Sequence, residues 1–519
     1  MPVNKLKKLQ NKKIAMLGLG VENLALVKFL LKTTPHRTTP TPPWKGGGFL
    51  KKEGGSLNIT ICDPKSAAEL GDRFLEIKEL ARKNKLPEIK LISGKNYDAQ
   101  LADFDIIFRS PGYPLFNKNL IKAKKAGVEI SSAMELFFEL CPTKNIIGIT
   151  GSKGKGTTSS LIYEIIKANL KSVTHPGASR HPSREGISQR VFLGGNIGTA
   201  PFEFIDRIKA DDFVVLELSS FQLEDLKISP KIAVITNIFK EHLAPADPNN
   251  PNYHKSMKDY WAAKANIFTH QKKNDYLVVN EKLKSNLSLR AQRSNLASTV
   301  RNGIASRGAR NDKNVVFYGK SELPSKLTGE HNKENIAAAV EVAKILKIKD
   351  EIIKKTVQKF QGLPHRLEFV AEINGVKYFD DSFATVPDVS VIALKAIGQP
   401  TPSALRGHPS REGNIILLAG GADKGSEFKN FAQEIKKRVK FLILFKGKGS
   451  ENLKKALRVT RYALCAKVDN MKDAVKIAKS KSKSGDIILL STGCASFGCF
   501  KNYKERGDQF KKEVLRQRT

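Results

Sequence analysis

The chain has 519 residues but no apolar run close to the roughly 18 residues that a membrane-spanning helix needs. Its first ten residues, MPVNKLKKLQ, also lack the apolar block of a secretory signal peptide. We therefore expect a cytoplasmic protein without membrane insertion.

Cysteine is scarce as well. There are five cysteines, an odd number, and no two of them form a CxxC pair. This usage indicates neither a disulfide framework nor a zinc site. We expect reduced thiols at Cys62, Cys141, Cys465, Cys494 and Cys499.

Acidic residues are few relative to basic ones, with 51 Asp and Glu against 89 Lys and Arg, a net charge of +38. Such an excess is typical of nucleic-acid-binding proteins. Here the basic residues are spread along the whole chain, and no helix-turn-helix or RNP-like motif accompanies them. We interpret the charge as a solvated surface that favours anionic substrates and expect no specific nucleic-acid partner. A basic nucleic-acid-binding protein is kept as the non-enzyme alternative, which a steep salt-dependent affinity for DNA would support.

The length is too great for one hydrophobic core and indicates about three domains. Apolar strands alternate with helical segments along most of the chain, which predicts an α/β fold. Four segments rich in Pro, Gly, Ser or Arg interrupt the alternation. They are residues 33–57, 172–190, 284–313 and 399–414.

Two of these segments repeat each other. Residues 180–186 read RHPSREG, and residues 407–413 read GHPSREG. We interpret the four segments as inserted sequence of common origin and expect surface loops, because lengthening a loop costs little free energy.

The most informative stretch is NIIGITGSKGKGTTSSLI, residues 145–162. It reads as an apolar strand, a glycine-rich turn and a hydroxyl-rich helix start. Such a turn directs backbone N–H groups at a phosphate, the helix N-terminus adds partial positive charge, and Lys155 can reach the terminal phosphates. Gly156 stands where Ser or Thr normally follows the lysine, so Thr157 is the expected source of the magnesium-facing hydroxyl. The predicted phosphate-binding residues are Gly151, Ser152, Lys153, Gly154, Lys155, Gly156 and Thr157.

Polar residues follow the next predicted strands of this region. The strand 213–218 carries Glu217 near its end, and the strand 232–236 is followed by His242. A buried glutamate beside a nucleotide lysine needs a cation partner, and Mg²⁺ suits hard oxygen ligands. A lone histidine is more often structural, but the position of His242 after a strand of the same domain strengthens the case for a site role.

A second nucleotide-like pattern lies at the N-terminus. A strand at 13–17 is followed by Gly18, Leu19 and Gly20, by a helix at 22–31 and by a strand that ends at Asp63. Removing residues 33–57 leaves about 20 residues between Gly18 and Asp63, the interval typical of a dinucleotide fold.

Asn23 replaces the third glycine of that pattern, so it predicts a Rossmann-like unit for some nucleotide moiety and not NAD. Ser110 and Gly112 follow the predicted strand 105–108 and would lie on the same edge of the sheet. As isolated residues they are ordinary turn formers.

Ten blocks resemble the Mur ligase family, in the family's order. They are GITGSKGKGTT (148–158), GGNIG (194–198), ELSSFQLE (217–224), TNIFKEHL (236–243), YWAAKANIF (260–268), GEHNKENIAAA (329–339), GLPHRLE (362–368), DDSFAT (380–385), GGADKG (420–425) and STGCASFGCFKNYKERG (491–507). The resemblance implies an α/β fold of three domains: a Rossmann-like UDP-binding domain over 1–141, a central P-loop-type ATP-binding domain over 142–363 and a C-terminal Rossmann-like amino-acid-binding domain over 364–519.

The blocks most resemble the branch of the family that adds glutamate to UDP-N-acetylmuramoyl-L-alanine. The resemblance implies an ATP-dependent amide ligase of cytoplasmic peptidoglycan precursor synthesis, which activates a carboxylate as an acyl phosphate. It also implies two magnesium ions and a Lys264 carbamylated by carbon dioxide, although sequence alone would make Lys264 an ordinary helix lysine. We expect a monomer.

The family pattern assigns residues to each substrate. Lys155, His242 and Lys264 are the implied catalytic residues, and the implied metal ligands are Thr157, Glu217, His242 and Lys264. Beyond the phosphate loop, ATP is assigned Asn332, Asn335, Arg366 and Asp381. The UDP-substrate is assigned Gly18, Leu19, Gly20, Asp63, Ser110, Gly112 and, nearer the muramoyl-alanine part, Asn196. Glutamate is assigned Thr385, Lys424, Ser496 and Tyr503.

Two positions depart from the pattern near the implied glutamate pocket. Phe383 stands where DSxAT commonly has lysine, and Tyr503 stands where phenylalanine is usual. A charged hydrogen bond contributes about 1.5–3 kcal/mol, so the missing cation leaves the glutamate's stereochemistry open. D-glutamate is the family's usual substrate and L-glutamate is the alternative. Another Mur or folylpolyglutamate-type ligase, and a non-catalytic binding protein, are further alternatives. Gly362 and Pro364 form an implied hinge before Arg366.

Overall fold

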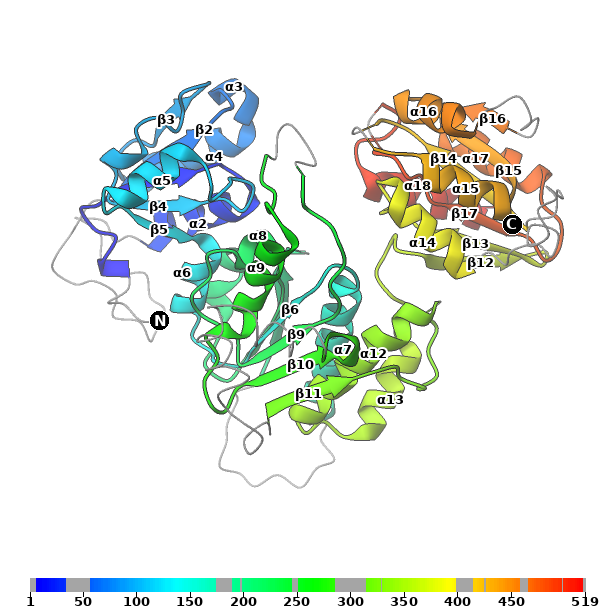
Figure 1. The fold of residues 1–519 in the computed structure, drawn as a ribbon, viewed down its shortest axis with the longest axis horizontal. Coiled ribbons are helices and arrows are strands. Elements are labelled where there is room, and N and C mark those ends of the chain that lie inside the picture. Colours follow the sequence, from blue (N-terminus) through cyan, green and yellow to red (C-terminus); the bar gives the residue numbers. More distant parts are fainter. Residues whose placement is uncertain are drawn as a thin grey trace. The chain divides into compact units, whose positions relative to one another are not determined.

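The computed structural model describes residues 6–33, 57–173, 189–196, 198–244, 251–284, 314–327, 329–397, 414–423, 426–457, 465–496 and 498–516. Most of the four predicted inserts, and with them the prediction of surface loops, lie outside these residues. The chain divides into two compact units, residues 1–322 with 334–356 and residues 323–333 with 357–519 (Figure 1). The three domains with boundaries at 141 and 363 stay a prediction.

The first unit begins with a five-stranded parallel sheet of order β3-β2-β1-β4-β5. Alternate residues of β1 face two separate hydrophobic clusters. Ile14 and Met16 belong to one cluster, and Ala15 and Leu17 belong to the other. This is why the strand reads as a continuous apolar run. The strands are β1 (Lys13–Leu17), β2 (Asn58–Asp63), β3 (Lys90–Ser93), β4 (Ile106–Arg109) and β5 (Glu129–Ser132). The helices are α2 (Val21–Thr33), α3 (Ala67–Leu70), α4 (Asp72–Lys83), η1 (Leu101–Asp103), α5 (Lys118–Lys125) and α6 (Ala133–Leu140).

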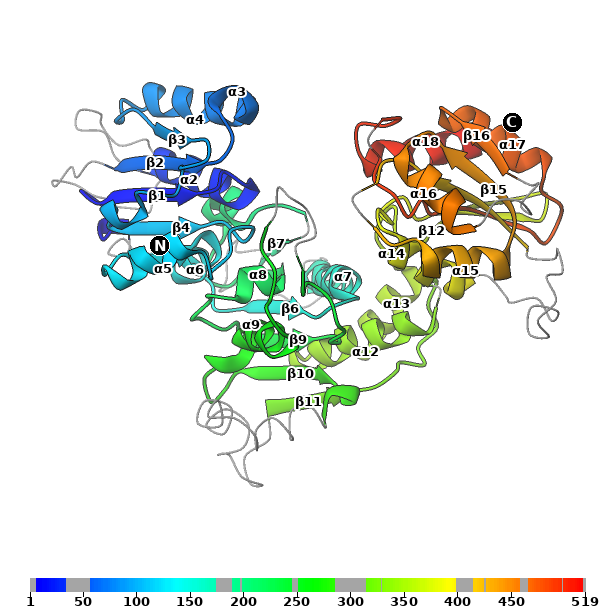
Figure 2. The same cartoon turned by 45° about the horizontal axis from the view of Figure 1, so that its top comes forward.

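The second sheet of this unit has six parallel strands in the order β11-β10-β9-β6-β8-β7 (Figure 2). Its central strand β6 is buried along its whole length. The strands are β6 (Ile146–Thr150), β7 (Val191–Gly195), β8 (Phe213–Glu217), β9 (Ile232–Ile235), β10 (Tyr276–Asn280) and β11 (Val315–Tyr318). The helices are α7 (Lys155–Val173), η2 (Pro201–Glu203), η3 (Ile205–Arg207), α8 (Ser220–Leu223), α9 (Met257–Thr269), η4 (Glu281–Leu283), α12 (Glu330–Ile345) and α13 (Asp350–Lys359).

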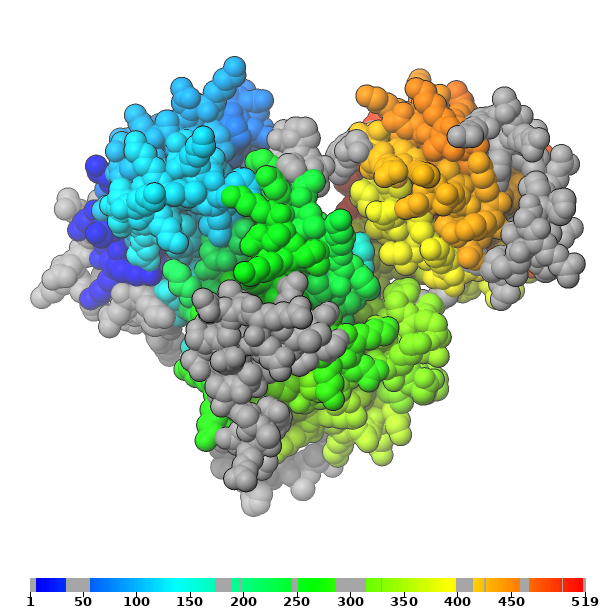
Figure 3. All heavy atoms as spheres, viewed as in Figure 1, coloured from blue at the N-terminus to red at the C-terminus, as the bar shows by residue number. Residues whose placement is uncertain are grey.

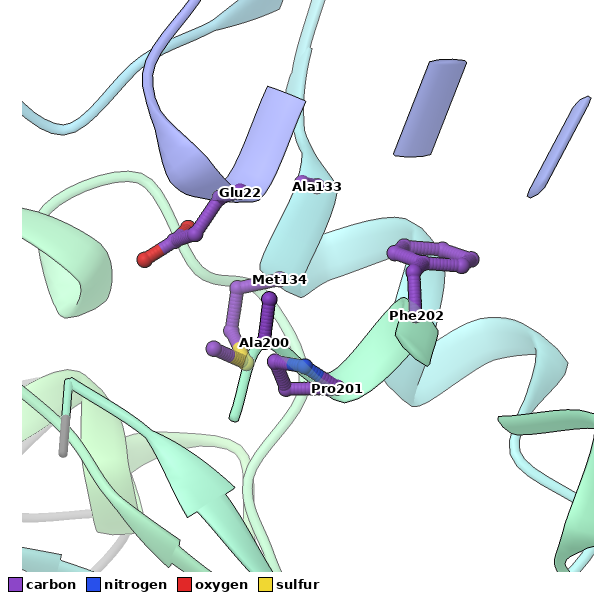
Figure 4. Close-up of a pocket in the computed structure, with 6 residues that line it drawn as sticks. All are labelled: Glu22, Ala133, Met134, Ala200, Pro201 and Phe202. Atoms are coloured by element: carbon purple, nitrogen blue, oxygen red, sulfur yellow. The ribbon is translucent and has the colours of Figure 1, made fainter. Parts of the chain in front are cut away.

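An aromatic seam joins the two sheets of the first unit. Phe202 of η2 lies 5.0 Å from Phe29 of α2 and 6.1 Å from Phe137 of α6, measured between ring centroids. Figure 4 shows Met134 of α6 beside Pro201, while the carboxylate of Glu22 turns away from Phe202. The two sheets therefore share a hydrophobic core.

A buried arginine adds a polar connection between the same two sheets. Arg109 ends β4 and is 1% exposed. Its Nε lies 2.7 Å from the Asp225 carboxylate, its Nη1 lies 3.5 Å from that of Glu224, and its Nη2 donates to the Phe221 carbonyl at 3.0 Å. The carboxyl edge of the first sheet is thus tied to the turn that follows β8.

The second unit has a six-stranded sheet of order β12-β13-β17-β14-β15-β16, parallel except for the antiparallel pair β12 and β13. Helices α14 to α16 belong to the residues coloured yellow to orange in Figure 3. These residues cover the face of the second unit that is seen in that view. The strands are β12 (Glu368–Ile373), β13 (Val376–Asp380), β14 (Ile415–Gly420), β15 (Val439–Phe445), β16 (Cys465–Val468) and β17 (Ile487–Leu490). The helices are α14 (Pro387–Ile397), α15 (Lys429–Arg438), α16 (Lys448–Leu457), α17 (Met471–Ser480) and α18 (Tyr503–Leu515).

The predicted elements around the two nucleotide-like patterns are confirmed with small shifts at their ends. The strand predicted over 105–108 is β4, Ile106–Arg109, because the Asp105 carboxylate accepts the Lys13 backbone N–H at 2.7 Å before the strand begins. The helix predicted over 22–31 extends over Val21–Thr33. The fold is mixed α/β with largely parallel sheets. Among the described residues, no helix combines the length and apolar character needed to cross a bilayer.

Replacing Arg109 with Met should destabilise the first unit, because Asp225 and Glu224 would lose their buried cation. We expect the free energy of unfolding to fall by about 3–5 kcal/mol, measured by urea titration with circular dichroism. Lys78→Met is the control, since Lys78 pairs with Glu88 at 3.2 Å on the surface. The control should change stability by less than about 1 kcal/mol. Equal effects of the two substitutions would contradict this account of Arg109.

Candidate active site

The phosphate loop lies between β6 and α7. Gly151 has φ +146° and Gly154 has φ +83°, both in the region that favours glycine. A Cβ at Gly151 would come within 1.9 Å of Thr236 Oγ1. The Ser152 N–H donates to the Asn237 carbonyl at 2.8 Å, and the Lys153 N–H donates to the Asn237 side-chain oxygen at 2.7 Å. Asn237, which follows β9, therefore holds the loop through two hydrogen bonds.

Two lysines converge on one carbonyl of this loop. The Nζ of Lys155 and the Nζ of Lys264 each donate to the Gly151 oxygen at 2.9 Å. Lys155 also donates to the Ser152 carbonyl at 3.0 Å. The helix dipole of α7 adds positive potential at the same place, so the arrangement attracts an anion.

Lys264 is an unusual helix lysine because only 2% of it is exposed. Its Nζ lies 4.8 Å from the centre of the Tyr260 ring and 3.3 Å from Thr150 Oγ1. Burial, and then the charge of Lys155, lower the pKa of Lys264 well below its ordinary value. The neutral amine is therefore favoured at a lower pH than in an exposed lysine.

Glu217 ends β8 beside the loop and is 2% exposed. One carboxylate oxygen accepts a hydrogen bond from Asn196 Nδ2 at 2.8 Å. The other oxygen is buried and has no hydrogen-bond partner. An orphaned carboxylate oxygen beside a phosphate loop fits a hard cation, and Thr157 on the first turn of α7 offers a hydroxyl. The donor set present therefore fits Mg²⁺.

Histidines and a tyrosine line the neighbouring turn. His242 has φ +59°, and its Nε2 lies 3.6 Å from Glu241 Oε1. The His242 side chain is 43% exposed, and its partial desolvation lowers its pKa, which keeps a nitrogen lone pair available for a metal. Tyr260 places its hydroxyl 2.8 Å from Ser152 Oγ and donates to Glu241 at 3.1 Å. His254 is 2% exposed, and its Nε2 lies 2.9 Å from Ser220 Oγ.

Asn335, assigned to ATP, also lies against the phosphate loop. Its side-chain oxygen is 3.5 Å from Thr158 Oγ1, and a Cβ at Gly154 would come within 2.1 Å of it. The structure thus brings together Lys155, Thr157, Glu217, Lys264 and Asn335 in the first unit. Asn332 lies in the first turn of the same helix, α12.

The residues assigned to the UDP-substrate gather at the carboxyl edge of the first sheet, where β2, β1 and β4 are neighbours. The Asp63 carboxylate accepts the Leu19 N–H at 2.7 Å, and the Ser110 N–H donates to the Leu17 carbonyl at 2.9 Å. Gly18, Gly20 and Gly112 lie at the same edge. Asn196 lies apart from this set, beside Glu217.

In the second unit, Asp381 follows β13 and is 4% exposed. Burial raises the pKa of Asp381 to about 7, while its hydrogen bonds from Ser491 Oγ at 2.7 Å and from the Leu367 N–H oppose the rise. Tyr503 begins α18. Ser496 is 6% exposed, and the Thr385 N–H donates to the Phe383 carbonyl. Lys424 lies outside the described residues.

Sequence reasoning missed Tyr260, His254 and Arg506. Tyr260 sits one helical turn before Lys264, so the i, i+4 spacing was a usable signal. Arg506 is 1% exposed and donates to Ser382 Oγ at 2.9 Å and to the Ser382 carbonyl at 2.7 Å. Burial lowers the pKa of Arg506 to about 10. No local pattern marked Arg506 or His254 as buried.

A cavity of about 790 Å³ lies elsewhere in the first unit. Its walls come from α5, β5, the 224–227 turn and α9. None of the residues assigned to ATP, metal or the UDP-substrate lines it. Asn266 lines the cavity from α9, but Lys264 of the same helix does not.

The sequence matches two family models. The Mur ligase middle domain matches residues 149–343, and the Mur ligase, glutamate ligase domain matches residues 365–494. The crystal structure of UDP-N-acetylmuramate-alanine ligase MurC from Thermotoga maritima is similar at 15% identity, with a TM-score of 0.49, covering 98% of this chain and 100% of that one.

Two curated relatives are similar over nearly the whole length. UDP-N-acetylmuramoylalanine--D-glutamate ligase of Clostridium botulinum (strain Kyoto / Type A2) is 34% identical over 516 residues, 97% of each chain. The ligase of the same name from Clostridium tetani (strain Massachusetts / E88) is 36% identical over 518 residues, 98% of each chain. Because identity of this degree extends over the full length, this chain belongs to the Mur ligase family.

Proposed function

We propose that this chain is the ATP-dependent ligase that adds D-glutamate to UDP-N-acetylmuramoyl-L-alanine in peptidoglycan precursor synthesis. The observation that carries the proposal is the convergence of Lys155 and Lys264 on one carbonyl of a glycine-rich loop. An orphaned Glu217 oxygen accompanies it at the end of β8, the strand paired with β6. The full-length similarity to curated D-glutamate ligases supports the same reaction. The three-domain arrangement, a cytoplasmic location and a monomeric state belong to this proposal.

The reaction needs a cationic cradle for ATP. The Lys155 ammonium and the remaining N–H groups of the 151–157 loop would hold the β- and γ-phosphates, since the Ser152 and Lys153 N–H groups donate to Asn237. They would stabilise the negative charge that develops on the γ-phosphoryl group during its transfer. Asn332, Asn335, Arg366 and Asp381 are proposed to complete the ATP site.

The chemistry then has two steps. A carboxylate oxygen of UDP-N-acetylmuramoyl-L-alanine attacks the γ-phosphorus, the bond to the β-phosphate oxygen breaks, and ADP and an acyl phosphate form. The amino nitrogen of glutamate attacks the acyl carbon through a tetrahedral intermediate. Phosphate leaves, the nitrogen loses its proton, and an amide remains. The residues of this chain contribute orientation and charge stabilisation to both steps.

Magnesium would be held by Glu217 and Thr157, with His242 and carbamylated Lys264 at a second ion. Bound there, the metal would neutralise phosphate charge during transfer. Two ions and the carbamate are proposed from the family pattern. The orphaned Glu217 oxygen supports the first ion.

The UDP moiety is proposed to bind at the carboxyl edge of the first sheet, through Gly18, Leu19, Gly20, Ser110 and Gly112. Asp63 already accepts the Leu19 N–H, so we propose that it shapes this loop as well as facing the substrate. Asn196 is proposed to act near the muramoyl-alanine part.

Glutamate is proposed to bind at Thr385, Lys424, Ser496 and Tyr503 of the second unit. Because Phe383 provides no cation, L-glutamate is kept as the alternative acceptor. The test is phosphate release from ATP and UDP-N-acetylmuramoyl-L-alanine with no amino acid, with D-glutamate or with L-glutamate. We expect stimulation by the D form only. Stimulation by the L form alone would overturn the stereochemical assignment, and stimulation by neither would overturn the acceptor.

Lys155→Ala should lower the rate of D-glutamate-dependent ligation by about 100- to 1,000-fold, the loss typical of removing one transition-state charge donor. Lys167→Ala on the same helix is the control, since Lys167 is a partly exposed lysine that pairs with Glu164. Amide product is measured by chromatography. Full activity of Lys155→Ala would refute the phosphate-loop assignment.

Lys264 should carry a carbamate, because its lowered pKa provides the neutral amine that reacts with carbon dioxide to give a carbamate anion and a proton. Protein equilibrated with ¹³C-labelled bicarbonate should show a carbamate carbon by NMR that Lys264→Arg lacks. The signal should decrease as the pH falls, because protonation removes the reactive amine. Full wild-type activity in carbon-dioxide-free buffer, together with no carbamate signal, would refute the assignment.

A further inference from the structure

We propose that Phe383 is a positioning residue that holds the guanidinium of Arg366 for the phosphates of ATP. The proposal rests on the proposed function, which assigns Arg366 to ATP. It gives a role to the position where a phenylalanine replaces the usual lysine.

The first support is direct contact between the two side chains. The Arg366 Cζ lies 3.8 Å from the centre of the Phe383 ring. The other cation–π contacts of the described residues span 4.8–5.9 Å. A separation of 3.8 Å is that of a guanidinium plane stacked on an aromatic face.

The second support is the backbone on either side of Arg366. The Phe383 N–H donates to the His365 carbonyl at 2.9 Å, and the Leu367 N–H donates to the Asp381 carboxylate at 3.1 Å. His365 and Leu367 have φ of +64° and +47°, so the segment has an uncommon conformation that these contacts maintain. The base of the Arg366 side chain is thereby fixed next to Phe383.

His365 anchors this segment more deeply. It is 6% exposed, and its Nδ1 lies 2.8 Å from Asp380 Oδ2. Its backbone N–H donates to Glu368 at 2.8 Å. A Cβ at Gly507 would come within 2.1 Å of His365 Nδ1, so α18 closes against the ring.

The third support is that the Phe383 ring is itself held. Tyr503 packs edge-on against it, with ring centroids 5.0 Å apart and planes at 83°. Ser382 Oγ donates to the Tyr503 carbonyl at 2.8 Å and so fixes α18 beside the ring. Edge-on packing is a favoured aromatic geometry. Tyr503 therefore supports Phe383 as Phe383 supports Arg366.

An aromatic partner suits an arginine that must later bind phosphate. A ring contacts only the guanidinium face, so it does not compete for the N–H groups at the edge of the guanidinium. A lysine at position 383 would instead place a second positive charge next to Arg366. A neutral ring at position 383 is thus compatible with the positive charge of Arg366, whereas a lysine there would repel it.

The test compares Phe383→Leu, which removes the ring but keeps an apolar side chain, with Phe383→Tyr, which keeps the ring. Affinity for ADP with Mg²⁺ is measured by titration calorimetry, and KM is measured for ATP and for D-glutamate. For Phe383→Leu we expect ADP binding to weaken, and KM for ATP to rise, by about 2- to 30-fold, the range of a lost cation–π contact. KM for D-glutamate should change less than KM for ATP, because Phe383→Leu also removes the ring that packs on Tyr503. Phe383→Tyr should match the wild type.

Phe369→Leu is the matched control. Phe369 lies on β12 of the same unit, is 49% exposed and contacts Phe379 edge-on at 5.5 Å. It should leave both KM values and ADP affinity unchanged. The same loss of ADP affinity in this control would overturn the proposal.

A double-mutant cycle completes the test. Arg366→Ala should weaken ADP binding less in the Phe383→Leu background than in the wild type, because the two residues act together. Equal effects in both backgrounds would overturn the proposal. A rise confined to KM for D-glutamate would also overturn it, by placing Phe383 in the glutamate pocket. Wild-type protein that releases no phosphate in response to D-glutamate would instead refute the proposed function, while the ADP cycle would still report on the pair.

Discussion

The described site depends on one electrostatic constraint, the approach of two lysine ammonium groups to the single carbonyl oxygen of Gly151. Two like charges at such a place repel each other. Burial and the charge of Lys155 both lower the pKa of Lys264, because they destabilise its ammonium form. The cost falls when Lys264 becomes neutral or anionic and when phosphate binds Lys155. An anionic ligand at the loop and an uncharged Lys264 amine are therefore the states that this geometry favours.

The surrounding fold serves that constraint. Gly151 and Gly154 leave no space for a Cβ, because Thr236 and Asn335 come directly against the loop. The carboxylate of Glu217 brings a negative charge to the end of the neighbouring strand, and one of its oxygens has no hydrogen-bond partner. Arg109 ties the carboxyl edge of the first sheet to the turn after β8, next to the second sheet.

The sequence allowed the parallel strands and the phosphate loop to be predicted, because strands buried on both faces read as apolar runs and glycine turns have fixed spacings. It did not reveal Arg109, His254 or Arg506, because burial of a charged side chain depends on partners far along the chain. Arg109 meets Asp225, and Arg506 meets Ser382, more than a hundred residues away. The Phe383 departure was visible in sequence, but its contact with Arg366 required the fold.

The central claim is that ATP activates a substrate carboxylate at this site. The most direct measurement uses UDP-N-acetylmuramoyl-L-alanine labelled with ¹⁸O in both carboxylate oxygens, incubated with ATP and D-glutamate. Mass spectrometry of the released phosphate reads the outcome. The account predicts one ¹⁸O atom in each phosphate and the other in the product amide, because the oxygen that attacks phosphorus leaves with it. Phosphate without ¹⁸O would show that ATP is hydrolysed by water and would contradict the account.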